Sequence, residues 1–337
     1  MPAQARALAD FIARPEAEQA RARFHEAAAE AGVPSSDDAA DLAAALSVAY
    51  PALAQGVRLH VADLIAFTRE GLKVPRDVRA YRRLLAASLP RADDAQEVRR
   101  AVRRFATREK LRIAARELLT PAGADVDVTA RELSDLADVC TEAAVQEARG
   151  WAEARFGVPT TAEGERCPFV VIGMGKLGGR ELNAGSDIDL LLFYETDDGE
   201  VLRDGAPTEQ TLHEHFARVA QRLVSTLDEV TDDGFVFRVD LRLRPEGSRG
   251  PLVNALAAAE RYYETWGRTW ERAALLRARP MAGDVAFGNE VLAALAPFVW
   301  RREVNPGLAE EMHQLVARAR TELAVDVERD LKLGRGG

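Results

Sequence analysis

The stretch that most constrains the fold is FVVIGMGKLGGRELNAGSDIDLLLFYE, residues 169–195. Its opening apolar run, residues 169–172, predicts a short buried strand, and the chain returns as a second strand over residues 187–194. The turn that follows the first strand contains Gly173, Gly175, Gly178 and Gly179. Because glycines tolerate positive φ and let backbone N–H groups approach an anion, we expect a strand–turn–strand unit whose turn accepts phosphate.

Two carboxylates begin the second strand. Residues two apart in a strand share a face, so Asp187 and Asp189 should point together beside the glycine turn. Carboxylates held close together repel unless a positive charge lies between them, and a hard cation such as Mg²⁺ prefers carboxylate and phosphate oxygens. A D-x-D pair alone is more often a solvated strand start. Its combination with the glycine turn favours the metal site, although the spacing is neither that of a P-loop nor that of a Rossmann fingerprint.

A third strand is predicted over residues 234–244, where apolar and polar side chains alternate. Its apolar face would contain Phe235, Phe237, Val239, Leu241 and Leu243, and its other face Val236, Arg238, Asp240, Arg242 and Arg244. If this strand lies beside the second one, Asp240 can reach the same cation as Asp187 and Asp189. A third carboxylate is what a two-metal phosphoryl-transfer site requires. The equally supported alternative is that Asp240 only pairs with Arg238 or Arg242.

Bulk properties exclude several classes of protein. The net charge of −9 argues against a general nucleic-acid binder, because neutralising phosphates supplies most of that affinity. No apolar run approaches eighteen residues and the N-terminus has no signal-peptide pattern, so we expect neither a membrane span nor export. Cys140 and Cys167 form no disulfide or metal pattern and are interpreted as reduced packing residues of a cytoplasmic protein.

Most of the remaining chain is predicted to be helical. Ser36 offers N-cap chemistry for a helix that runs to Tyr50. Residues 97–119 have helical spacing, and their many arginines are interpreted as a solvated face in preference to a patch for an acidic partner. Residues 129–132, T-A-R-E, fit a capping box and predict a helix start.

Further along, residues 159–168 and 196–207 are expected to be loops that flank the strand–turn–strand unit. A helix is predicted over residues 208–229, with an apolar stripe along one side. It carries His213 and His215, which are two apart and therefore lie on different helix faces, unlike the i, i+4 pair of a zinc site.

The order of these motifs resembles known families. Met174-Gly175-Lys176, followed after ten residues by Asp187-Ile188-Asp189, resembles the signature of polymerase-β-like nucleotidyltransferases, with Gly-Lys in place of the usual Gly-Ser. The segments GMGKLGGRELNAGSDIDLL, FVFRVDLRLRPEGSRGPLV and GRTWERAALLRARP together resemble the glutamine-synthetase adenylyltransferase/adenylyl-removing enzyme family. The resemblance extends from about Arg103 to the C-terminus, and ELSDLA at residues 132–137 belongs to it.

This resemblance implies an α+β fold: a polymerase-β-like nucleotidyltransferase domain with a small mixed sheet, flanked by helical segments. We expect a helical N-terminal region over residues 1–150, the catalytic domain over 151–285, and the start of a C-terminal helical region over 286–337. The final residues 334–337, GRGG, follow an amphipathic helix and suggest that the natural protein continues.

Members of this family are bifunctional: an N-terminal copy removes AMP from a tyrosine of glutamine synthetase by phosphorolysis, and a C-terminal copy attaches it from ATP. Residues 267–272, G-R-T-W-E-R, look more like the N-terminal copy, because Arg272 stands where the other copy tends to have histidine. The resemblance therefore implies AMP removal, with adenylylated glutamine synthetase, inorganic phosphate, ADP or ATP, and the PII signal protein as partners. Adenylyl transfer from ATP, and a non-catalytic module that binds PII, remain alternatives.

The resemblance also assigns roles to residues. Asp187, Asp189 and Asp240 would be the catalytic residues and would hold Mg²⁺ or Mn²⁺. The expected phosphate contacts are Gly175, Lys176 and Ser186, with Arg242 and Arg244 for inorganic phosphate, since a guanidinium group suits bidentate phosphate contact.

Overall fold

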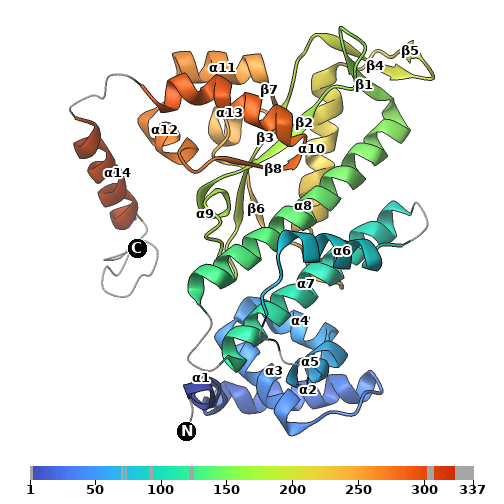
Figure 1. Ribbon diagram of the computed structural model, residues 1–337, viewed down its shortest axis with the longest axis vertical. Helices are drawn as coiled ribbons and strands as arrows, with labels where there is room; N and C mark the ends of the chain where they lie inside the picture. The colour runs from blue at the N-terminus through green and yellow to red at the C-terminus, as the bar shows by residue number, and fades with distance from the viewer. Residues whose placement is uncertain are drawn as a thin grey trace.

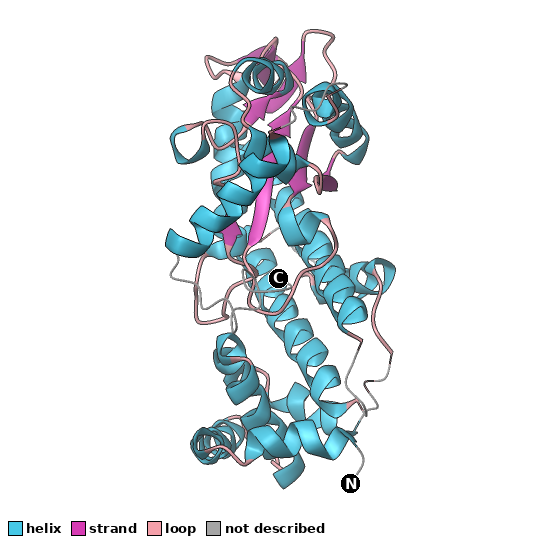
Figure 2. Cartoon of the chain, turned by 90° about the vertical axis from the view of Figure 1, so that its left-hand side faces the viewer, coloured by secondary structure: helices cyan, strands magenta, loops and turns pink. Residues whose placement is uncertain are grey.

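The structure is a computed structural model that describes residues 3–69, 72, 74–90, 94–120, 125–301 and 307–322. The molecule is elongated, with a helical bundle at the N-terminal end and a layer of strands and helices at the other (Figures 1 and 2). It is α+β, as the sequence predicts. Among the described helices, none combines the length and apolar character that crossing a membrane requires.

The N-terminal bundle has its own hydrophobic core. Its elements are α1 (Ala3–Ile12), α2 (Pro15–Glu30), α3 (Asp37–Ala49), η1 (Pro51–Leu53), α4 (Ala54–Leu59) and α5 (Val61–Arg69). Helix α3 begins where predicted, because the Ser36 hydroxyl accepts the Ala39 N–H at 3.3 Å. Leu42 and Leu46 of α3 and Leu64 of α5 are fully buried in this core.

Three further helices join the bundle to the sheet: α6 (Val78–Ser88), α7 (Ala95–Leu119) and α8 (Val126–Phe156). Helix α7 confirms the predicted helix over residues 97–119. It contributes to two cores, with Leu111 in the bundle and Val102 and Phe105 in the core below the sheet. The domain limit expected at residue 150 lies within α8.

The interpretation of the arginines of α7 as a solvated face is wrong for Arg103 and Arg112, which are 5% and 2% exposed. Arg116, in the last turn of the same helix, is 4% exposed. Arg112 donates from Nε to Glu109 at 2.8 Å and also pairs with Glu132, and Arg116 lies 2.8 Å from the other Glu132 oxygen. Buried charges need partners, and these carboxylates come from α7 itself and from α8, which helical spacing cannot reveal.

The capping box predicted at residues 129–132 is also wrong. Helix α8 begins at Val126, where the Asp125 carboxylate accepts the Asp127 N–H at 2.9 Å. Thr129 and Glu132 lie inside the helix and face α7, where the Thr129 hydroxyl accepts from Arg116. The same residue types that cap a helix thus serve here as buried hydrogen-bond partners.

The main sheet contains β2 (Phe169–Gly173), β3 (Ile188–Tyr194), β6 (Val239–Asp240) and β8 (Arg279–Gly283) in the order β6-β3-β2-β8, with β7 (Asn254–Ala255) also paired to β3. Strands β2 and β3 are antiparallel, which confirms the predicted strand–turn–strand unit. Strand β6 is parallel to β3 and places Asp240 directly opposite Asp189.

The third strand is much shorter than predicted, since only Val239 and Asp240 of residues 234–244 are in a strand. Val236 and Phe237 are both buried although they are adjacent, and both of their N–H groups donate to the Leu227 carbonyl at 3.0 Å. This segment therefore packs on the end of α10 (Leu212–Asp228) and does not extend the sheet. Alternating polarity cannot distinguish such a buried irregular segment from a half-buried strand.

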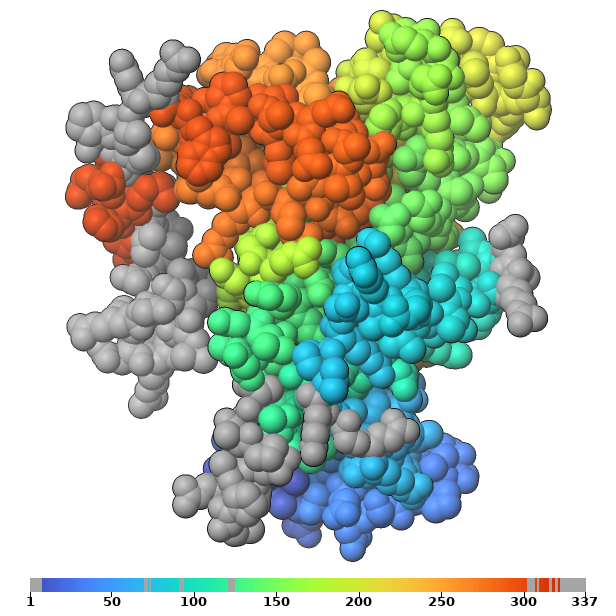
Figure 3. Space-filling view, viewed as in Figure 1, coloured from blue at the N-terminus to red at the C-terminus, as the bar shows by residue number. Residues whose placement is uncertain are grey.

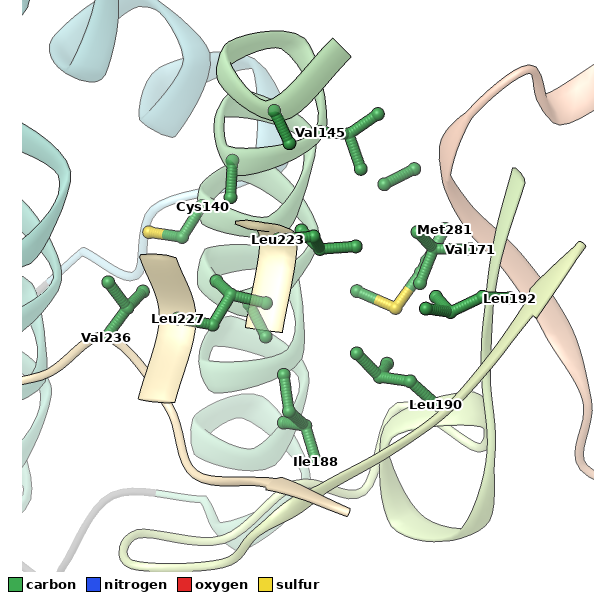
Figure 4. Packing of buried hydrophobic residues seen from close by; sticks show 14 of the residues in the cluster. Cys140, Val145, Val171, Ile188, Leu190, Leu192, Leu223, Leu227, Val236 and Met281 are labelled. Carbon is green, nitrogen blue, oxygen red and sulfur yellow. The ribbon is translucent and has the colours of Figure 1, made fainter. Parts of the chain in front are cut away.

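Both faces of the sheet are covered, which explains why β2 and β3 are continuous apolar runs. Helices α8 and α10 cover one face, where Cys140, Leu223, Val171 and Leu192 lie around a common interior (Figure 4). The other face is covered by α11 (Leu256–Thr265) and α13 (Val285–Val299). Helices α12 (Thr269–Leu275) and α14 (Leu308–Glu322) complete the described chain. Cys140 and Cys167 are buried free thiols, as predicted.

A second, small sheet was not predicted. Strands β1 (Val158–Thr161), β4 (Gly199–Arg203) and β5 (Ala206–Pro207) pair in the order β1-β4-β5, within the two segments expected to be loops. These strands are short and carry many polar side chains, so they have no apolar alternation by which sequence could identify them. The expected final glycine segment, residues 334–337, lies outside the described residues.

Candidate active site

An open cavity of about 720 Å³ lies where the glycine turn, the start of β3 and β6 meet. Its lining residues come from three segments of the chain: Gly175, Lys176, Gly185, Ser186, Asp187, Asp189, Arg238, Asp240, Arg242, Leu243 and Arg277. In the space-filling view, the yellow-green glycine-turn segment reaches the surface between the orange C-terminal helices and the green of α8 (Figure 3). The structure thus brings together every predicted site residue except Arg244.

The glycine turn is a single helical turn, α9 (Gly175–Gly178), entered directly from β2. The Met174 N–H donates to the Asp189 carbonyl at 2.9 Å, which fixes the turn to β3. Gly175 has φ +53°, and a Cβ at this position would lie only 2.7 Å from Asp189 Oδ2. Glycine is therefore required at this position both by the backbone conformation and by the close approach to a carboxylate.

The three predicted carboxylates share the cavity. Asp187 precedes β3, and Asp189 and Asp240 are direct partners in the parallel β3–β6 pair. Two arginines lie against them: Arg238 Nε is 2.6 Å from Asp187 Oδ1, and Arg242 Nε is 2.8 and 3.0 Å from the two Asp240 oxygens. Asp240 therefore pairs with Arg242, as the alternative interpretation expected, and also shares the cavity with Asp187 and Asp189.

The arginine contact controls the charge of Asp240. The hydrogen bond from Arg242 lowers the pKa of the Asp240 carboxyl, and Asp240, Asp189 and Asp187 together raise the pKa of the Arg242 guanidinium. Asp240 is therefore ionised at neutral pH. Arg242 is 77% exposed, so turning its side chain into solvent would uncover both Asp240 oxygens.

The donor chemistry fits a hard divalent cation, because the cavity offers carboxylate and hydroxyl oxygens and neither thiol nor imidazole. In the described part of the chain, no three His, Cys, Asp or Glu side chains are already arranged as metal ligands. The side chains of Arg238 and Arg242 supply positive charge beside Asp187 and Asp240. His215, on α10, is buried in the core and does not line this cavity.

Asn183 is a site residue that the sequence analysis missed. The Ser186 hydroxyl donates to Asn183 Oδ1, and the Lys176 ammonium lies 3.4 Å from the same oxygen. Arg238 was also missed as a bridging residue, since its Nη2 donates to the Gly185 carbonyl at 2.8 Å while its Nε binds Asp187. Their only signal in the sequence is that they lie inside the two long motifs.

Arg244 does not reach the cavity, contrary to the expectation that it shares the face of Asp240. The residue is 9% exposed, and its guanidinium donates to three backbone carbonyls, those of Leu241 at 2.9 Å, Gly250 at 3.2 Å and Ser248 at 3.3 Å. The chain leaves the strand after Asp240 and turns, so the two-residue periodicity no longer applies. Arg244 stabilises the loop that follows.

Comparisons of this sequence with a family pattern and with known proteins agree on one family. The sequence pattern of the family described as glutamate-ammonia ligase adenylyltransferase matches residues 44–294. A bifunctional glutamine synthetase adenylyltransferase/adenylyl-removing enzyme from Nitrosococcus oceani is 42% identical over 260 residues, which is 76% of this chain and 26% of the relative.

Proteins of the same name give similar values. The one from Thioalkalivibrio sulfidiphilus is 44% identical over 258 residues, 75% of this chain and 26% of the relative. The one from Pseudomonas aeruginosa is 41% identical over 285 residues, 84% of this chain and 28% of the relative. The chain spans about a quarter of the length of these relatives. On the match over residues 44–294, the chain belongs to the glutamate-ammonia ligase adenylyltransferase family.

Proposed function

We propose that this chain removes AMP from the adenylyl-tyrosine of glutamine synthetase by metal-dependent phosphorolysis, which gives ADP and unmodified tyrosine. The observation that carries the proposal is the convergence of Asp187, Asp189 and Asp240 beside the glycine turn, in a chain whose relatives are named adenylyltransferase/adenylyl-removing enzymes. A polymerase-β-like catalytic domain over residues 151–285, between helical regions over 1–150 and 286–337, is part of the same proposal.

Asp187, Asp189 and Asp240 would hold Mg²⁺ or Mn²⁺, which supplies charge neutralisation at the phosphorus centre when bound. The absence of a side chain at Gly175 lets the turn lie directly against Asp189. Lys176 lines the same cavity and adds a positive charge to it. Lys176, the Gly175 backbone and Ser186 therefore contact the phosphate oxygens of the adenylyl group.

In the reaction, an oxygen of inorganic phosphate forms a bond to the phosphorus of AMP as the bond from phosphorus to the tyrosine oxygen breaks. The proton lost by phosphate ends, through solvent, on the tyrosine oxygen, whose pKa in solution is about 10. Arg242 is exposed and already lies at the cavity, so it binds the incoming phosphate once it has turned from Asp240. The chain's contribution is mainly positioning and electrostatic stabilisation.

The direction of the reaction rests on the G-R-T-W-E-R pattern at residues 267–272. Adenylyl transfer from ATP would use the same carboxylates and the same glycine turn, so it is the second candidate function. A regulatory module that binds PII would not need the carboxylates at all, and the intact set of Asp187, Asp189 and Asp240 favours an enzyme.

The test is a paired assay of the purified chain with adenylylated glutamine synthetase and Mn²⁺, with and without inorganic phosphate. We expect release of ADP only when phosphate is present. The Asp187→Asn, Asp189→Asn double variant should lose this activity and keep the urea unfolding curve of a folded protein. A matched control is Asp232→Asn, at an exposed aspartate outside the cavity, which should keep the activity.

Each alternative has its own result in this assay. Incorporation of AMP from ATP into unmodified glutamine synthetase, without phosphate-dependent ADP release, would indicate the transferase. Retained turnover in the Asp187→Asn, Asp189→Asn variant would contradict the metal mechanism. Binding of PII without turnover in either direction would indicate a regulatory module.

A further inference from the structure

Two parts of the family resemblance have not yet been considered, the ELSDLA segment of α8 and the RARP segment that leads into β8, of which only Arg277 lines the cavity. The two segments meet beside the glycine turn, where Asp138 and Arg279 are 141 residues apart in sequence. Asp138 of α8, which follows ELSDLA, forms a two-pronged ion pair with Arg279 of β8. The two contacts are 2.8 Å from Nη1 and 2.9 Å from Nη2, and the side chains are 8% and 20% exposed.

Arg279 uses its remaining N–H groups on the glycine turn itself. Its Nη2 donates to the Leu177 carbonyl at 3.2 Å and its Nε to the Gly178 carbonyl at 3.3 Å. These carbonyls belong to the last residues of α9, where a helix leaves its carbonyl groups without partners inside the helix. One guanidinium therefore joins α8 to the C-terminal end of the turn.

The backbones of the turn and of the segment before β8 are in direct contact. A Cβ at Gly178 would lie 1.9 Å from the Arg277 carbonyl oxygen and 2.6 Å from that of Gly173. Arg279 is the strand partner of Gly173, the last residue of β2 before the turn. The turn is therefore packed closely against the segment that carries Arg279, so we expect a movement of Arg279 to displace the turn.

Helix α8 holds the continuation of the turn at two further points. The Ser134 hydroxyl accepts the Leu182 N–H at 3.3 Å, and Asp135 pairs with Arg180, whose φ is +58°. Burial raises the pKa of the Asp138 carboxyl although Arg279 opposes this. An ion pair in this environment resists separation, because its carboxylate has lost most of its water.

We propose that the Asp138–Arg279 pair is a positioning element of the candidate active site, which holds α9 so that Gly175 and Lys176 stay against the carboxylates of β3 and β6. Arg279 touches neither substrate nor the reacting atoms. The expected effect of the Asp138–Arg279 pair on catalysis rests on the proposed phosphorolysis, whereas the expected effect of the pair on the glycine turn does not.

The chain contains a matched control for this pair. Arg222 of α10 binds Glu147 of α8 with Nε contacts of 3.0 and 3.3 Å, and the side chains are 20% and 3% exposed. This pair also joins α8 to a neighbouring element and is equally buried, but it makes no contact with the glycine turn. Arg279→Lys and Arg222→Lys each keep the charge and lose the planar fork.

The experiment compares the two variants by hydrogen exchange of the peptide that covers residues 174–183 and by steady-state phosphorolysis of adenylylated glutamine synthetase. Arg279→Lys should speed exchange in this peptide and lower kcat at least about tenfold with little change in KM, because a small misplacement of site groups is enough for such a loss. Arg222→Lys should change neither, even if it lowers the overall stability by a similar amount.

Unchanged exchange over residues 174–183 in Arg279→Lys would overturn the proposal, and so would faster exchange with a kcat equal to that of Arg222→Lys. If the wild-type chain shows no phosphorolysis, the proposed function fails. In that case the exchange comparison still tests the proposal. Faster exchange in Arg279→Lys alone supports the proposal that the Asp138–Arg279 pair positions the glycine turn, and equal exchange in both variants contradicts it.

Discussion

Replacing Gly175 with alanine tests whether the glycine turn must lie directly against the Asp189 carboxylate. Two effects add at this position. The φ of +53° costs a residue with a side chain about 1–2 kcal/mol of folding free energy. The new Cβ would also lie 2.7 Å from Asp189 Oδ2, well inside van der Waals contact, so the carboxylate must move.

The second effect should appear in cation binding. Carbon and oxygen atoms rarely approach much closer than 3.2 Å, so relief of the contact displaces the carboxylate by about half an ångström, beyond the tolerance of about 0.2 Å for metal–ligand distances. We therefore expect Mn²⁺ affinity to fall at least about tenfold, a loss of the size seen when support around metal ligands is removed. Isothermal titration with Mn²⁺ measures the affinity, and urea unfolding measures the stability.

Two other glycines serve as controls, because they have a positive φ but no close contact at the position of an added Cβ. Gly185 lines the same cavity with φ +80°, and Gly32 lies in the N-terminal bundle with φ +65°. A Cβ at either position meets no atom within 4 Å. Gly185→Ala and Gly32→Ala should lose similar stability and keep Mn²⁺ affinity. Wild-type Mn²⁺ affinity in Gly175→Ala, or an equal loss of affinity in Gly32→Ala, would show that the close approach of Gly175 to Asp189 does not control cation binding.

Two further predictions concern buried charged or titratable groups. Glu132→Gln removes the charged partner of Arg112 and Arg116 and should lower the free energy of unfolding, measured in urea, by about 3–5 kcal/mol. Glu97→Gln, in an exposed pair on α7, should lower it by less than about 1 kcal/mol. Similar losses in the two variants would contradict a stabilising role for the buried charges. Burial, with nearby arginines, lowers the pKa of His215 from 6.5 to about 4. The unfolded chain therefore takes up this proton first as the pH falls, so the free energy of unfolding should drop by about 3 kcal/mol between pH 6.5 and 4. His215→Leu should remove this pH dependence of the free energy of unfolding. An unchanged pH dependence in His215→Leu would show that other groups cause it.

The part of the site that sequence could predict is the part controlled by local periodicity. Residues 169–194 form the predicted strands because their apolar runs are bounded by a glycine turn and fit a sheet buried on both faces. The two-residue repeat of a strand correctly placed Asp187 and Asp189 in one cavity, although Asp187 lies one residue before β3. The position of Asp240 beside them required the third segment to be a neighbour of β3, and the parallel pairing confirms it.

The parts that sequence could not predict depend on contacts between distant segments. Arg112 has the helical spacing of an exposed residue, and only the approach of α8 makes it buried. Arg244 belongs to an alternating pattern, but the chain turns after Asp240 and directs its guanidinium to carbonyls. The contacts of Asn183 with Ser186 and Lys176 are instead local, three and seven residues away in the loop after α9, and apolar periodicity carries no signal for them.

In the proposed site, three carboxylates from two segments of the chain hold one pool of divalent cations. Anomalous diffraction from crystals grown with Mn²⁺ would locate these cations. We predict a peak in the cavity coordinated by oxygens of Asp187, Asp189 and Asp240, with Arg242 turned away from Asp240. A cavity without a peak at saturating Mn²⁺, in which Asp240 stays paired with Arg242, would contradict the account.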